Sequence, residues 1–293
     1  MQDINNETAK RQPKYQRHVG LILAIVLAVS LVRLMWQGSA QEFIVAGLAG
    51  ILPALFWLWF WLKEDTIHPE PKRSIFKAFA FGAIAVPATI LLEQAVDILV
   101  REAFSLPSAE TLPLEGLVPA VAFIMFLLWS AIEECAKLFS AVRADFAEKD
   151  YDEPVDAAIY LISAAIGFSA LESAFFVWQA ILDNGILDGI FLSQLRFMGA
   201  GLLHIVSSAF IGLFIGLAFY RSARAKRIFL GLGLLTAILL HAFFNFFIMV
   251  GNGSYTLQVF AGLWVMTIAV FFFFEKVKRI TPLTSETTKR HVQ

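Results

Sequence analysis

The stretch LVPAVAFIMFLLWSAIEECAKLFSAV, residues 117–142, decides the fold class because it is almost continuously apolar. About 20 such residues cross a bilayer as an α-helix. The whole chain fits this interpretation, with 58% hydrophobic residues, 16% charged residues and a mean hydropathy of +0.71. The eight predicted spans are 19–36, 43–62, 75–98, 117–142, 156–181, 197–220, 228–250 and 256–274. The sequence therefore predicts an all-α, polytopic membrane helix bundle.

The basic residues predict how the bundle is oriented. Most of the 23 Lys and Arg residues fall in the two tails and in alternate loops, and basic loops are retained on the cytoplasmic side. We expect both termini in the cytoplasm, with tails at 1–18 and 276–293 around one membrane domain at 19–275. The location expected is the plasma or inner membrane. The first span resembles a secretion signal, but its length and Arg33 favour an uncleaved anchor.

The distribution of charge also limits the partners. A net charge of −1 gives no indication of nucleic-acid binding, and topology accounts for the basic loops. The expected surroundings are the lipid bilayer and its anionic headgroups. A single cysteine, Cys135, excludes an intrachain disulfide, and we interpret it as a small buried residue.

Ionisable residues inside the spans point to a functional site. A charged side chain at the bilayer centre costs about 3 kcal/mol on insertion scales, so such residues are rare and usually functional. Here they concentrate on four consecutive spans at similar depths. The candidates are Glu133, Glu134, Lys137, Glu172, His204, His241 and Asn245. We interpret them as one buried cavity, although a single Glu–Lys pair or buried His is often only a contact between helices.

The stretch EECAK at 133–137 is suited to holding a base. Lys137 follows Glu133 by four residues and Glu134 by three, so one ammonium group faces both carboxylates on a helix. That arrangement allows at least one carboxylate to stay ionised where water is scarce.

Other features of the spans favour structural roles. Glu93, Asp97 and Arg101 are spaced by four residues and predict a ladder of ion pairs near the end of their span. The GxxxG spacing at 212–216 allows another helix to approach closely.

Several motifs together resemble the PrsW family of intramembrane proteases, which is related to the CAAX-prenyl-protease and bacteriocin-immunity superfamily. They are EECAK (133–137) for EExxK, FSALE (168–172) for FxxxE, HIVSS (204–208), and HAFFN (241–245) for Hxxx[D/N]. The flanking stretches HPEPKRSIFKAFAFG (68–82) and YDEPVDAAIY (151–160) are also similar. Asn245 departs from the family pattern, which usually ends in Asp, and is closer to the CAAX-protease form.

The resemblance implies an intramembrane endopeptidase acting on a membrane-associated protein such as an anti-sigma factor or another regulator. It also implies roles for the candidates. Glu133 or Glu134 would activate the attacking water, Glu172 and His204 would lie beside it, and His241 and Asn245 would lie near the scissile carbonyl.

Two versions of the chemistry stay open. In a version without a cofactor, which we favour, a glutamate is the base and His241 with Asn245 donates to the oxyanion. In a version with Zn²⁺, the ligands would be Glu172, His204 and His241, a two-His-one-Glu set.

Two other classes of protein also carry intramembrane Glu, His and Lys residues. One is a proton-coupled transporter, in which such residues form proton relays. The absence of an inverted repeat in the sequence argues against it. The other is a non-catalytic membrane scaffold that kept the motifs to bind a partner.

Overall fold

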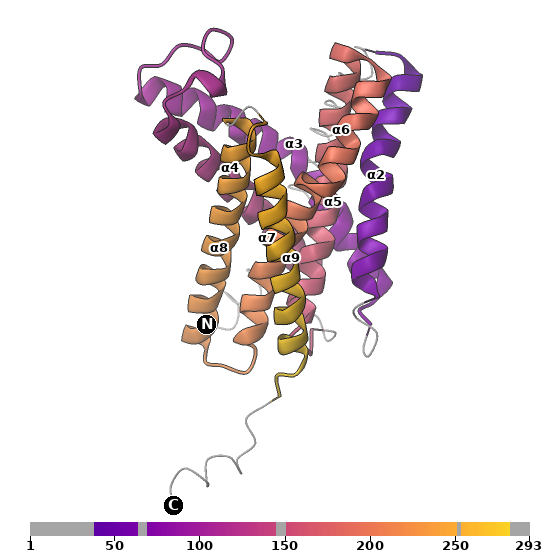
Figure 1. Ribbon diagram of the computed structural model, residues 1–293. Coiled ribbons are helices and arrows are strands. Elements are labelled where there is room, and N and C mark those ends of the chain that lie inside the picture. The colour runs from indigo at the N-terminus through magenta and orange to yellow at the C-terminus, as the bar shows by residue number, and fades with distance from the viewer. Residues whose placement is uncertain (1–37, 64–68, 145–150, 251–252, 282–293) are drawn as a thin grey trace, which may run out of the picture.

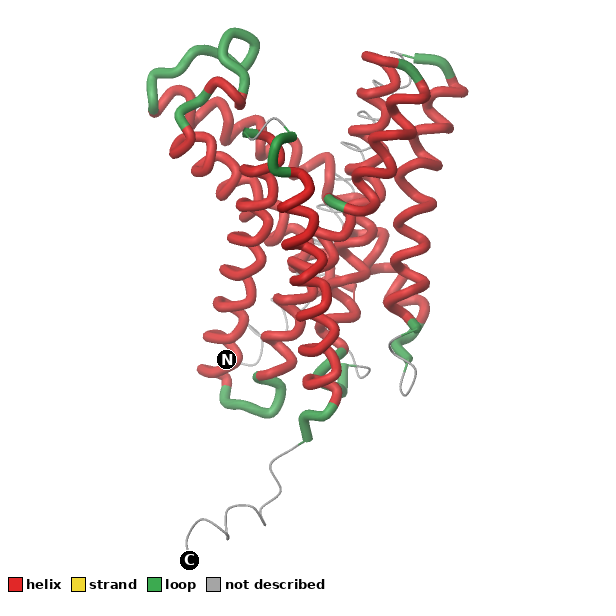
Figure 2. Tube along the Cα trace, in the orientation of Figure 1, coloured by secondary structure: helices red, strands yellow, loops and turns green. Residues whose placement is uncertain are grey.

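The computed structural model describes residues 38–63, 69–144, 151–250 and 253–281 (Figure 1). Within these ranges the only regular structure is helical (Figure 2). The helices are α2 (Ala40–Leu62), α3 (Lys72–Ala103), the short 3₁₀ helix η1 (Leu114–Gly116), α4 (Pro119–Ala144), α5 (Asp156–Asn184), α6 (Ile186–Met198), α7 (Ala200–Leu217), α8 (Ala223–Met249) and α9 (Thr256–Lys278). The all-α prediction is therefore confirmed.

Seven predicted spans appear as helices long and apolar enough to cross a membrane. They correspond to α2, α3, α4, α5, the α6–α7 unit, α8 and α9. The eighth, at 19–36, lies outside the described residues, as do the tail 1–18 and most of the tail 276–293. The protein is thus a multi-pass membrane protein. The C-terminal ends of α2, α4, α7 and α9 lie at one end of the bundle, opposite the 104–118 loop (Figure 1).

Helix α6 was not predicted. The sequence left residues 182–196 between two spans, whereas the structure forms a helix that begins directly after Gly185, where φ is +94°. Helix α6 ends at Gly199, which separates it from α7. The predicted span at 197–220 is therefore the second half of a broken helical unit. This break sets the position of Arg196 relative to α5.

Helix α5 is the centre of the bundle and packs against α2, α3 and α7. Its first half is almost entirely buried and rich in Ala, Ser and Gly. At Gly167 a Cβ atom would lie 1.9 Å from the carbonyl oxygen of Phe79, so only glycine permits this approach of α3. A Cβ atom at Gly212 of α7 would lie 2.3 Å from Cα of Ala158, a close approach that the GxxxG spacing predicted. Small residues are what bring helices this close in membranes.

Candidate active site

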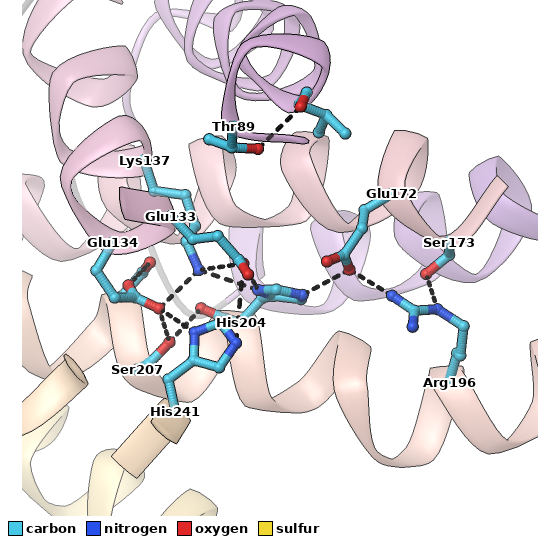
Figure 3. A network of polar contacts seen from close by, with 12 residues as sticks. Thr89, Glu133, Glu134, Lys137, Glu172, Ser173, Arg196, His204, Ser207 and His241 are labelled. Carbon is cyan, nitrogen blue, oxygen red and sulfur yellow. Dashed lines mark hydrogen bonds and ion pairs between the residues drawn. The ribbon is translucent and has the colours of Figure 1, made fainter. Parts of the chain in front are cut away.

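Six of the seven candidate residues form one buried network at the middle of the bundle (Figure 3). Helix α4 contributes three of them, and α5, α7 and α8 contribute one each. The six are Glu133, Glu134, Lys137, Glu172, His204 and His241. Except for Glu172, which is partly exposed, all are at most 5% exposed. The convergence of side chains from four helices explains why the sequence spreads them over more than 100 residues.

Glu134 is the most completely bonded member of the network. Its Oε1 accepts from Nζ of Lys137 at 2.6 Å and lies 2.8 Å from Nδ1 of His241. The hydroxyls of Ser207 and Ser208 donate to its two oxygens at 2.9 and 3.3 Å. A carboxylate bonded in this way is stable without water, and it ties α4 to α7 and α8. Glu134 therefore has the environment of an anchor.

Glu133 has the opposite environment, although it is the next residue on the same helix. Its Oε2 is buried and has no hydrogen-bond partner among the described residues. The surrounding nitrogens are Nδ1 of His204 at 3.7 Å, Nε2 of His241 at 3.8 Å and Nζ of Lys137 at 3.9 Å. Buried polar atoms without a partner are rare and usually have a functional explanation. Oε2 of Glu133 is thus the centre of the network.

The hydrogen bonds of the two histidines fix which nitrogens face this oxygen. Nε2 of His204 lies 2.9 Å from Oε2 of Glu172. An ionised carboxylate only accepts hydrogen bonds, so this nitrogen carries the proton and Nδ1 presents a lone pair. By the same reasoning Nδ1 of His241 donates to Glu134 and leaves Nε2 bare. Both bare nitrogens point toward Glu133, and the rings are nearly perpendicular at 86°.

This donor set fits a divalent metal. One ligand atom each from Glu133, His204 and His241 lies within 4.8 Å of the others. Two histidines and one carboxylate form a known catalytic zinc set, and metal-binding histidines usually donate their other N–H to a carboxylate, as both do here. Nζ of Lys137 lies 2.9 Å from Nδ1 of His204. The unprotonated Nδ1 therefore accepts a hydrogen bond from this ammonium group, which a bound metal would displace.

The carboxylate in this group differs from the one predicted. The sequence suggested Glu172 with His204 and His241, but Glu172 is engaged elsewhere. Its Oε2 accepts from Arg196 of α6 as well as from His204, so it supports a histidine from behind. Glu133 faces both bare nitrogens instead.

Sequence reasoning missed the part played by Arg196. The side chain donates to Glu172 and, through Nε, to the hydroxyl of Ser173 at 3.0 Å. Its guanidinium group also lies 4.2 Å from the ring centre of Phe176. Arg196 lies in the last turn of α6, just before the break at Gly199, and its side chain reaches Glu172 and Ser173 (Figure 3). The available signal in the sequence was a lone arginine beside an apolar stretch.

Comparison with known proteins identifies the family. The model of the family described as "PrsW family intramembrane metalloprotease" matches residues 70–274. The chain belongs to the PrsW family. This match contains all four helices that build the network. PrsW relatives are proteases, so the protein is a membrane protease.

Curated relatives named "Protease PrsW" support the assignment. The one from Geobacillus kaustophilus is 23% identical over 74% of this chain and 86% of its own length. The relative from Clostridioides difficile is 25% identical over 69% of this chain and 79% of its own. The Bacillus subtilis relative is 22% identical over 68% and 80% of the two chains. No solved structure matches the chain.

Two further residues of the predicted PrsW site region, Asn245 and Cys135, lie outside the network. Asn245 is half-buried on α8, one turn after His241, and makes no hydrogen bond to the described residues. Its role at the oxyanion therefore stays a prediction. Cys135 is exposed on the outside of α4, so the interpretation of a buried thiol is wrong. It lies on α4 away from Glu133 and Glu134, which face inward.

Proposed function

We propose that this PrsW protease hydrolyses a peptide bond in a membrane-anchored regulatory protein, with Glu133, His204 and His241 as its reactive centre. The observation that carries the proposal is the buried, unpartnered Oε2 of Glu133, which two bare histidine nitrogens face at 3.7 and 3.8 Å. The proposed location is the cell membrane with both termini in the cytoplasm, because the basic loops lie on one side.

The three residues of the reactive centre would hold a divalent metal such as Zn²⁺. When bound, it would act as a Lewis acid and make a water molecule a better nucleophile near neutral pH. The protein's part is to hold the unprotonated nitrogen of each histidine toward the reactive centre. Glu172 does this for His204, and Glu134 does it for His241. Their carboxylates hold both rings in the tautomer that binding requires.

Glu172 is the proposed proton acceptor for the attacking water. Its Oε2 is held by Arg196 and His204, while Oε1 makes no hydrogen bond to the described residues. The arginine favours the ionised form of the carboxylate, as a base requires. After the attack, the same carboxyl group can return the proton to the leaving amine.

Two further residues would stabilise charge during the reaction. Nζ of Lys137 lies within 3.9 Å of Glu133 and bonds to Glu134, so its positive charge is fixed beside the reactive centre. The amide of Asn245 is the proposed donor to the oxyanion, because a neutral N–H group is well suited to that task.

The experiment that tests the proposal compares protein ends in membranes from cells expressing the wild type, Glu133→Gln or Glu102→Gln at equal levels. Glu102 is an exposed carboxylate at the end of α3 and serves as the matched control. New protein ends in the wild type and in Glu102→Gln, absent from Glu133→Gln, would identify the substrate. Identical ends in all three would reject proteolysis at this site.

A further inference from the structure

A large cleft lies between α3, α4 and the loop that joins them. Its volume is about 640 Å³. One wall is a stripe along α3 formed by Glu93, Asp97 and Arg101, and α4 contributes Trp129. The indole of Trp129 donates to the carbonyl oxygen of Glu93 at 3.1 Å and bridges the two helices. The cleft is therefore a feature built by two helices and their connecting loop.

One wall of this cleft comes within about one helical turn of the reactive centre. Trp129 precedes Glu133 by four residues on α4, so the two lie on the same face of the helix about one turn apart. Glu93 forms no ion pair with the described residues, so among them the predicted ion-pair ladder is reduced to Asp97 and Arg101. A chain lying in the cleft therefore passes Trp129, about one turn from Glu133.

Arg101 supplies an unused hydrogen-bond donor in the cleft wall. Arg101 is only 5% exposed, and its Nε donates to Oδ1 of Asp97 at 2.9 Å. Its Nη1 donates to the carbonyl oxygens of Pro107 and Leu112 at 3.0 and 2.9 Å. Its Nη2 has no partner among the described residues. Leaving a buried charged donor unpaired is unfavourable, so an arriving carbonyl group would be stabilised here.

The charges around the cleft favour one kind of occupant. Asp97 is neutralised by Arg101. Glu93 and Glu115 also line the cleft and form no ion pair with the described residues. The lining therefore combines two free acidic groups with a donor for a carbonyl oxygen. This combination suits an extended polypeptide that carries a basic side chain.

We infer that this cleft binds the extended segment of the substrate that adjoins its membrane span and directs it to Glu133. A main-chain carbonyl group of the segment accepts from Nη2 of Arg101, and a Lys or Arg side chain lies between Glu93 and Glu115. Substrate then enters from the end of the bundle that carries the 104–118 loop. The inference rests on the proposed function, because it assigns the path to the proposed reactive centre.

A photo-crosslinking experiment tests the inference with a pair of neighbouring positions. Ile98 lines the cleft and is 65% exposed, whereas Leu99 is 62% exposed and does not line it. Benzoylphenylalanine is placed at position 98 or 99 of a Glu133→Gln protein in phosphatidylcholine vesicles. The probe is a biotinylated synthetic peptide with a Leu/Ala span of about 20 residues and a Gly/Ser tail that contains two lysines. A second probe has glutamates in place of the lysines.

We expect the lysine probe to be captured about fivefold more at position 98 than at position 99. At position 98 it should also be captured about fivefold more than the glutamate probe. A fivefold difference is what one hydrogen bond or ion pair would give. Arg101→Lys, which keeps the charge opposite Asp97 but lacks Nη2, should lower capture at position 98. Equal capture at both positions, or capture that ignores the charge of the tail, would overturn the inference. Cleavage of the lysine probe by the wild type is measured separately. Specific capture without cleavage would count against the catalytic proposal alone, and cleavage without specific capture against the cleft alone.

Discussion

Replacing the adjacent glutamates Glu133 and Glu134 one at a time by glutamine should reduce stability to very different extents. The two residues share a helix and are similarly buried, at 5% and 0% exposure, but only Glu134 is fully bonded. We expect Glu134→Gln to destabilise the protein strongly. We expect Glu133→Gln to leave the fold intact and to abolish proteolysis.

The magnitude for Glu134→Gln follows from its partners. The change removes the negative charge 2.6 Å from Nζ of Lys137, a residue with no exposed surface. Removing one partner of a buried ion pair costs about 3–5 kcal/mol. The bonds from His241, Ser207 and Ser208 end on the same carboxylate, so their loss is part of this cost. At about 2–4 °C per kcal/mol for a chain of this size, the melting temperature should fall by roughly 6–20 °C.

The expected loss of stability for Glu133→Gln is small. Its Oε2 has no hydrogen bond to lose, and the nearest ammonium lies 3.9 Å away. We expect a loss of at most about 1 kcal/mol, which is typical of a weak ion pair. Thermal unfolding in detergent, followed by circular dichroism, measures both variants. Equal shifts in melting temperature for the two variants would refute this assignment of roles.

Three further predictions concern the support of the site and the packing of the bundle. Arg196→Gln should lower the rate of cleavage about 10- to 100-fold, as loss of a supporting residue typically does, and Arg196→Lys should lower it less. Equal cleavage rates for both variants and the wild type would contradict the supporting role of Arg196. Removal of divalent metal with a chelator should abolish cleavage, and added Zn²⁺ should restore it. Elemental analysis should find about one bound zinc per wild-type chain and less on Glu133→Gln. Full activity after chelation would reject the metal. Gly167→Ala should destabilise the bundle by about 1–3 kcal/mol, because its Cβ would lie 1.9 Å from the oxygen of Phe79, whereas Gly262→Ala, where space is open, should be neutral or stabilising by thermal unfolding.

The sequence predicted most of the fold because membrane spans depend on local composition. Seven of the eight spans appear as expected. Helix α6 was missed because Asp188 and Arg196 interrupt its apolar run. In the structure Arg196 is paired with Glu172 of a neighbouring helix. A local stretch of sequence does not contain both members of this ion pair, since they are 24 positions apart.

The membership of the site was also predictable, but the division of roles within it was not. Charged side chains inside a membrane are costly and therefore rare, and this rarity was enough to identify the residues that converge. Glu133 and Glu134 both face Lys137 by helical spacing, so spacing cannot distinguish them. Ser207 and Ser208 on α7 make the difference by donating to Glu134 and not to Glu133. Likewise, Arg196 and His204 both bond to Glu172, so Glu133 is the carboxylate that faces the two unprotonated histidine nitrogens.

The most direct test of the central claim is single-turnover cleavage by purified protein in vesicles, using the substrate that the comparison of protein ends identifies. Wild type, Glu133→Gln and the control Glu102→Gln are measured after each is shown to have the same melting temperature. We predict that Glu133→Gln loses at least about 10³-fold in rate, the scale of losing an essential catalytic group, while Glu102→Gln matches the wild type. Cleavage by Glu133→Gln at the wild-type rate would contradict the assignment of Glu133 to the reactive centre.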